Sequence, residues 1–221
     1  LEKLIYFKFK PSLSSLSVTS VKQELLELLV KGGMNSLTLG VETFDNEVQK
    51  RVGKIVTAKK LSECFELAFG MGMKSIKLYL MLGLPGAESD EENLIIEEVT
   101  NLHKLAQTQK PGSRITISLN PFIPKIATLF KRERFMGEKS FRRKMGVIRK
   151  KCAKIGVKVK SESHRDSLIQ YLLSCGDESM STIIEMLALK KNFSEIRNTL
   201  PDDLESYMSS SIEKVDKLIL R

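Results

Sequence analysis

The sequence lacks the marks of a membrane protein or a secreted protein. No apolar run reaches 18 residues, which excludes a membrane-spanning helix, and no charged segment followed by an apolar one stands at the start, so we expect no secretory signal. The three cysteines, Cys64, Cys152 and Cys175, have no metal-ligand spacing, and their odd number argues against a disulfide framework. Because each falls in an apolar helical pattern, we expect buried free thiols in a cytoplasmic protein.

Motifs of several enzyme classes are also missing. The sequence contains neither a glycine-rich phosphate loop nor a Gly-x-Ser-x-Gly elbow. Its two histidines, His103 and His164, fall in a predicted helix and a polar loop, and neither has an obvious catalytic partner. The sequence therefore gives no indication of a common nucleotide-hydrolysing site or of a serine-hydrolase site.

The composition is that of a globular protein. Hydrophobic residues make up 42% and charged residues 29% of the 221 residues, which excludes a disordered or fibrous chain. The length fits one large α/β domain or two domains. Since the sequence starts at Leu1 rather than Met, we expect it to be a piece of a longer protein.

Positive charge is concentrated in one segment. The whole chain has a net charge of +9, and residues 131–160 contain thirteen Lys or Arg against two Glu. A solvated face of an amphipathic helix is the commoner explanation for such a run. Contact with RNA phosphates is the alternative, although the segment offers no aromatic stacking platform.

The first part of the chain alternates strand patterns with helix patterns. Such alternation predicts βαβ units with right-handed crossovers, and therefore a parallel sheet of an α/β protein. Four strands are too few for a closed eightfold barrel, so we expect an open sheet or part of a barrel. The predicted strands are residues 4–9, 36–41, 76–84 and 114–119, and the predicted helices begin near 20, 44, 58 and 89.

The pattern changes after the fourth strand. Two prolines and polar residues predict an irregular loop to about residue 137, and apolar residues at helical spacing follow. We expect residues 1–125 to form the α/β part and residues 126–221 a basic, mainly helical extension. In the extension we expect helices from 140, over 165–174, 178–190 and 202–220, and a short strand at 157–159.

Candidate ligand-binding residues follow the predicted strands, because parallel sheets bind ligands at the carboxyl ends of their strands. They are Ser14 and Ser15, then Glu42, the turn at 83–86, and Asn120. A carboxylate directly after an apolar strand needs a partner. From the residues alone, a salt bridge or helix cap at Glu42 is as good an explanation as ligand binding, and the turn could be purely structural.

Three segments resemble one family in order and spacing. They are GVETFDNEVQKRVGK at 40–54, KLYLMLGLPG at 77–86 and ISLNPFIPK at 117–125, which look like successive strands of radical S-adenosylmethionine (SAM) enzymes. The segment SHRDSLIQYLLSCGD at 163–177 is similar to a stretch of the Fe–S oxidoreductase branch, which includes proteins with a cobalamin-binding domain. The resemblance implies the second half of a partial (βα)6 TIM-like barrel.

The resemblance also implies site residues. Glu42 matches a position that binds the SAM ribose or amino group, which suits a carboxylate. Lys54 matches a position that pairs with the SAM carboxylate in some members, although a solvated lysine at a helix end explains it equally well. Asn120 matches the strand that flanks the adenine, and Ser15 lies in the preceding strand-end region.

The sequence departs from the family pattern in several places. Tyr79 stands where some relatives have an acidic ribose contact, and Ser17 replaces an expected arginine. The family's Cys-x3-Cys-x2-Cys motif, which binds a [4Fe–4S] cluster, is missing, and without it SAM cannot be reductively cleaved. We therefore expect an oxidoreductase fragment that is inactive alone, whose partner is the missing N-terminal half of the barrel.

Other interpretations stay open at this point. A non-catalytic basic α/β module would bind RNA or a protein and would be indifferent to SAM. A different α/β enzyme would use Glu42 with a phosphate-bearing ligand at the 83–86 turn. Because half a barrel exposes a sheet edge, we also expect a dimer or strand exchange.

Overall fold

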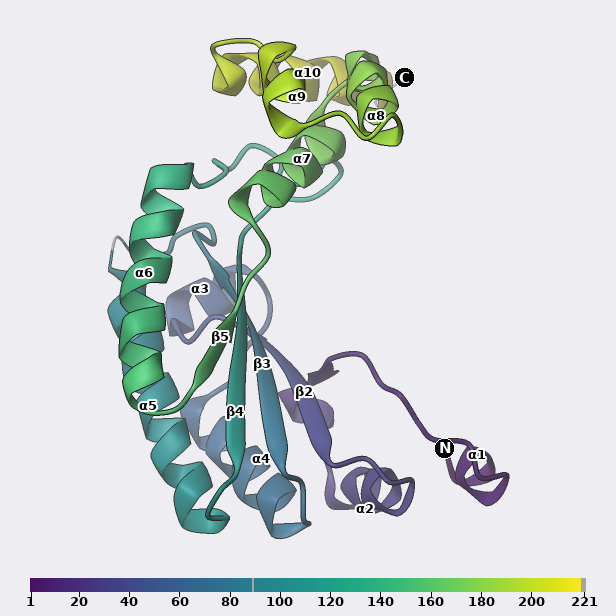
Figure 1. Ribbon diagram of the computed structural model, residues 1–221, viewed down its shortest axis with the longest axis vertical. Helices are drawn as coiled ribbons and strands as arrows, with labels where there is room; N and C mark the ends of the chain where they lie inside the picture. The colour runs from purple at the N-terminus through teal and green to yellow at the C-terminus, as the bar shows by residue number, and fades with distance from the viewer. Residues whose placement is uncertain (89, 220–221) are drawn as a thin grey trace. The chain divides into compact units, whose positions relative to one another are not determined.

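A computed structural model describes residues 1–88 and 90–219 of the chain (Figure 1). The chain divides into two compact units, which we describe separately. Unit 1 comprises residues 1–120 and 138–161, and unit 2 comprises residues 121–137 and 162–221. The helix that begins near residue 140 thus belongs to the same unit as the sheet.

Unit 1 is built on a five-stranded sheet. Its strands are β1 (Leu16–Ser17), β2 (Ser36–Glu42), β3 (Ser75–Leu82), β4 (Arg114–Pro121) and β5 (Lys158–Lys160), in the order β1-β2-β3-β4-β5. The pairs β1–β2, β2–β3 and β4–β5 are parallel. This order follows the chain without reversal, as it does along the wall of a (βα) barrel. The predicted α/β class and parallel sheet are therefore confirmed.

Helices cover one side of this sheet. They are α2 (Gln23–Lys31), α3 (Asn46–Arg51), α4 (Ala58–Gly70), α5 (Glu91–Gln109) and α6 (Glu138–Lys154). Crossovers of one hand between strands in sequential order leave their helices on the same side, and Figure 1 shows α4, α5 and α6 along one side of β2 to β4. Thr57 caps α4 by accepting from the Lys60 amide. The helix predicted to begin near residue 89 starts at Glu91, and residue 89 itself lies outside the described residues.

The prediction of a strand over residues 4–9 was wrong. The chain instead forms a short helix, α1 (Glu2–Tyr6), in which the Ile5 amide donates to the Leu1 carbonyl at 3.1 Å. A strand satisfies its backbone groups only beside another strand, and β1 is the strand that pairs with β2. The alternating residues of this segment therefore form local helical hydrogen bonds.

The two faces of the sheet differ in chemistry. Side chains on the helix side are apolar and buried, with Leu39, Leu78 and Ile117 each at 0% exposure. The opposite side carries mostly polar side chains, and we call it the open face. Its residues are Ser17, Thr38, Gly40, Lys77, Tyr79, Met81, Thr116, Ser118, Asn120, Lys158 and Lys160. Gly40 and Ser118 (8% exposed) are buried, and the others are of intermediate or full exposure.

Unit 2 is helical, as expected for the C-terminal part. It contains α7 (His164–Cys175), the 3-10 turn η2 (Glu178–Met180), α8 (Ser181–Ala188), α9 (Phe193–Asn198) and α10 (Leu204–Ile219). The prediction missed α9, which an Asn192–Glu195 capping box starts. Across the described part of the chain, no helix has the length and apolar character to cross a membrane.

Asp177 joins three elements of unit 2. It lies between α7 and η2 and accepts hydrogen bonds from the Ser179 hydroxyl at 2.7 Å, from Lys214 at 2.9 Å and from Tyr207 at 3.2 Å. These hydrogen bonds, with that of Ser179 the largest cause, hold the pKa of Asp177 well below its ordinary value. The ionised carboxylate therefore ties α10 to the end of α7.

Candidate functional site

The carboxyl end of β2 has a distorted backbone. Gly40 pairs with Tyr79, but Glu42 pairs with Leu80, so β2 contains one extra residue between them. Glu42 has a φ of 70°, a left-handed conformation that is unfavourable by roughly 1–2 kcal/mol for a residue with a Cβ atom. Strain of this kind concentrates at functional sites, and here it accompanies the carboxylate that the sequence analysis singled out.

Three of the four predicted site residues meet around Gly40. A Cβ atom at this glycine would lie 2.9 Å from Lys54 Nζ, 3.3 Å from Glu42 Oε1 and 3.8 Å from Ser15 Oγ. Lys54 Nζ donates to Glu42 Oε1 at 2.5 Å, and the two side chains are 35% and 24% exposed. A side chain at position 40 would push Lys54 aside. We call Ser15, Gly40, Glu42 and Lys54 the cradle.

Gln49 fixes the positions of Glu42 and Lys54, the two charged residues of the cradle, relative to each other. It is 1% exposed; its amide donates to the Thr43 carbonyl at 2.8 Å and its Oε1 accepts from the Val56 amide at 3.0 Å. These bonds fix the segment that carries Lys54 against the segment that follows Glu42. Gln49 was not among the predicted site residues, and its one visible signal in the sequence is its position beside Val48 in a short predicted helix.

A partly buried carboxylate, that of Glu91, holds the turn after β3. The Gly83 amide donates to both carboxylate oxygens of Glu91, at 3.0 and 3.1 Å. Gly83 and Gly86 have φ values of 73° and 90°, which glycine adopts without penalty. The side chain of Arg51 lies 3.5 Å from the place of a Cβ on Gly86, so the turn is enclosed on that side.

Lys144 of α6 secures this turn from behind. Its ammonium lies 3.1 Å from Glu91 and 2.8 Å from Glu92, and Arg143 lies 2.8 Å from Glu92. Burial raises the pKa of Glu91. Burial also opposes ionisation of Glu92, but hydrogen bonds from Lys144 and Arg143 outweigh it and lower its pKa. Lys144 is 4% exposed, so it departs from the solvated helix face that the basic run at 131–160 predicts.

Asn120 lies apart from the cradle but on the same edge of the sheet. It stands near the end of β4, and β3 separates β4 from β2. Glu42, Gly83 and Asn120 thus follow one another along the carboxyl edge of three neighbouring strands, as predicted from the strand ends. Ser14 and Ser15 do not follow a strand but precede β1, so the prediction that they stand at the carboxyl end of a strand was wrong.

The cysteines do not form a cluster site. Cys64, Cys152 and Cys175 lie buried on α4, α6 and α7. Burial raises the pKa of Cys64 to about 12 and that of Cys152 to about 11, so both are thiols rather than the thiolates that bind metals. Over residues 1–88 and 90–219, no three His, Cys, Asp or Glu side chains are placed to hold a metal ion. These residues do not fit a [4Fe–4S] cluster.

Comparison with known proteins identifies relatives of the whole chain and of its first part. The model of the radical SAM superfamily matches residues 3–97. An uncharacterized protein of Methanocaldococcus jannaschii, MJ0966, is 30% identical over 203 residues, which cover 91% of this chain and 43% of that protein. The heme chaperone HemW of Bacillus subtilis is 38% identical over 63 residues, 28% of this chain and 17% of that protein.

A solved structure is also similar. Coproporphyrinogen III oxidase (HemN) of Escherichia coli, a radical SAM enzyme, matches with a TM-score of 0.49 and 18% identity over 64% of this chain and 32% of that chain. The chain spans less than half the length of these relatives. The narrower expectation of the branch with a cobalamin-binding domain stays a prediction. On the match of the family model to residues 3–97 and the similarity in sequence to curated proteins, the chain belongs to the radical SAM superfamily.

Proposed function

We propose that this chain supplies part of the S-adenosylmethionine site of a radical SAM oxidoreductase. The observation that supports it is the convergence of Ser15, Glu42 and Lys54 on the space that Gly40 leaves free. When bound and reductively cleaved, the cofactor supplies 5′-deoxyadenosyl chemistry. The part of this chain is to bind and orient the cofactor.

The charges of the cradle match the methionyl end of the cofactor. That end is a zwitterion, with an ammonium and a carboxylate on one carbon atom. Glu42 accepts from the ammonium or from a ribose hydroxyl, and Lys54 pairs with the carboxylate. The ion pair between Glu42 and Lys54 is thus replaced by contacts of each side chain with the cofactor. Ser15 offers a hydroxyl beside them, and Asn120 flanks the adenine farther along the same edge.

Ligands for the [4Fe–4S] cluster belong, in this proposal, to a part of the protein outside this chain. The sequence has no Cys-x3-Cys-x2-Cys motif, and its three cysteines are buried on separate helices. The chain alone is therefore inactive in SAM cleavage, and its partner is the N-terminal half of the barrel. Three free thiols also fit our expectation of a cytoplasmic protein.

Calorimetric titration of SAM into the chain tests the proposal. We expect Glu42→Gln and Lys54→Met each to weaken binding about tenfold, because each removes a charge-assisted hydrogen bond. Lys50→Met is the matched control, since Lys50 is exposed and pairs with Glu47 on the outside of α3. No binding by the unchanged chain, or equal affinity in all three variants, would contradict the proposal.

RNA binding by residues 131–160 and dimerisation stay predictions. Part of the basic segment is neutralised, because Arg142, Arg143 and Lys144 pair with glutamates. The edge strands β1 and β5 have two and three residues, and short edges resist pairing with other strands. Electrophoresis with tRNA at two salt concentrations tests the first prediction, and size measurement in solution tests the second.

A further inference from the structure

The open face of the sheet is unusual for the inner side of a barrel wall. Inner positions of (βα) barrels are mostly filled by bulky branched residues that form a packed core. Here β3, β4 and β5 present lysine, tyrosine, threonine and serine instead. Such side chains do not pack into an apolar layer and are suited to contact water or a polar ligand.

The register of the strands brings these side chains together. Thr116 pairs with Lys158 and Ser118 with Lys160, so these four residues point to the same side of the sheet, away from the buried Ile117. The Arg114 amide donates to the Lys74 carbonyl at 3.1 Å, where both strands begin. Equal steps along β3 and β4 then bring Thr116 to the level of Lys77 and Ser118 to the level of Tyr79.

Tyr79 directs Lys77 toward this group. Lys77 Nζ donates to the Tyr79 hydroxyl at 3.0 Å and lies 4.3 Å from the centre of its ring. Because Tyr79 is two residues nearer the carboxyl edge, the ammonium is drawn to the level of Ser118 and Lys160. A row of hydroxyl groups thus has an ammonium on each side.

The charge of this surface is uncompensated. Glu42 is the one acidic residue at the open side of the described strands, and it is paired with Lys54. Among the residues that the structure describes, Lys77, Lys158 and Lys160 form no ion pair. Three cations beside two hydroxyls are complementary to an oxyanion.

We propose that the open face binds the anionic end of a small-molecule substrate, a carboxylate or a phosphate, between Lys77 on one side and Lys158 and Lys160 on the other. Thr116 and Ser118 donate to the same oxygens from the sheet. The occupant's role as substrate depends on the proposed function, because the cradle at Gly40 lies on the neighbouring strand, next to Tyr79. The anion site itself does not depend on it.

Two probes test the site and separate the two chemistries. Citrate and inorganic pyrophosphate are titrated into the chain at low salt, and the amide NMR signals of Thr116 and Ser118 report binding. We expect Lys77→Gln and the double variant Lys158→Gln/Lys160→Gln to bind about five- to tenfold more weakly. Stronger binding of citrate identifies a carboxylate substrate, and stronger binding of pyrophosphate a phosphate substrate.

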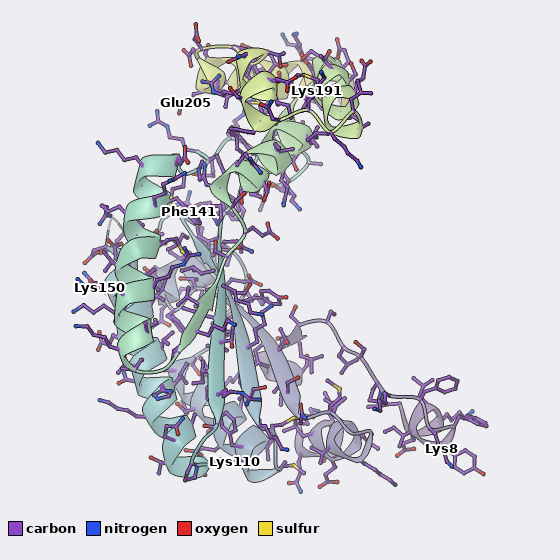
Figure 2. The ribbon with its side chains drawn as sticks, in the orientation of Figure 1. Lys8, Lys110, Phe141, Lys150, Lys191 and Glu205 are labelled. Carbon is purple, nitrogen blue, oxygen red and sulfur yellow. The ribbon has the colours of Figure 1, made fainter. Side chains whose placement is uncertain are left out.

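The control is a double variant on the outside of the same unit. Lys150 and Lys151 are exposed on α6, and Figure 2 shows Lys150 directed away from the sheet. Lys150→Gln/Lys151→Gln removes the same charge and should leave both affinities unchanged. An equal loss in this control, or unchanged binding in the open-face variants, would overturn the proposal.

The same measurements distinguish a failure of the anion site from a failure of the cofactor site. Glu42→Gln should bind SAM about tenfold more weakly but bind both anions as the unchanged chain does. If SAM binds and depends on Glu42 while neither anion moves the Thr116 and Ser118 signals, the anion site is refuted and the cofactor site stands. The reverse result refutes the cofactor site alone.

Discussion

Replacing Glu42 by glycine and by alanine should separate backbone strain from the chemistry of the side chain. Both changes remove the carboxylate and its ion pair with Lys54, so their difference reports the backbone alone. At a φ of 70° alanine retains a penalty of about 1–2 kcal/mol that glycine escapes. The greater freedom of glycine in the unfolded chain returns roughly 0.5–1 kcal/mol. We therefore expect Glu42→Gly to be more stable than Glu42→Ala by about 1 kcal/mol.

An exposed helical position provides the control for this comparison. Glu66 lies in the middle of α4 and is exposed, and there glycine should be less stable than alanine by about 1 kcal/mol. Urea unfolding is followed through the NMR amide signals of β2 and β3, which report on unit 1. The same order of stability at both positions would show that Glu42 is unstrained and refute the reasoning.

Three further predictions concern buried groups elsewhere. Lys144→Met leaves Glu91 and Glu92 without their shared cation and should lower the free energy of unfolding of unit 1 by about 3–5 kcal/mol, measured in urea. The control Lys150→Met should change that free energy by less than about 0.5 kcal/mol. Equal effects of the two variants would contradict the role of Lys144. The lowered pKa of Asp177 gives stability that is present above its unfolded-state pKa, about 4, and is lost as pH falls. The unfolding temperature of unit 2 should fall in acid, and should fall less in Asp177→Asn. Cys64 and Cys152, with pKa values of about 12 and about 11, should react with a disulfide reagent at pH 8 only as fast as the chain unfolds.

The central strands could be predicted because local sequence determines them. A strand buried under helices on one side shows apolar residues at every second position, as β3 does from Ile76 to Leu82, and glycine or proline marks its end. Residue types also pointed to Glu42, since a carboxylate after an apolar strand needs a partner, whereas Lys54 was predicted only from the family resemblance. The structure supplies that partner 12 residues away.

Contacts between residues distant in sequence could not be predicted. Lys144 carries the same pattern as its exposed neighbours on α6, and its burial depends on two glutamates 52 and 53 residues earlier in the chain. Segment 4–9 alternates like a strand, but β1 occupies the place beside β2, and the segment forms a short helix instead. Periodicity predicts the side of an element that is buried and leaves its partner undetermined.

The distinction between the two faces of the sheet connects the fold to the proposed chemistry. Strands in sequential order with crossovers of one hand leave all helices on one side, so apolar side chains are required on that side alone. The other side is free to carry charge, and along β2 to β5 it carries the cradle and then the three lysines. A strand order that reversed would have placed a helix over Lys77 and buried its ammonium without a partner, at a large cost in free energy. The winding of the sheet therefore leaves neighbouring strands free for the proposed cofactor site and the proposed anion site.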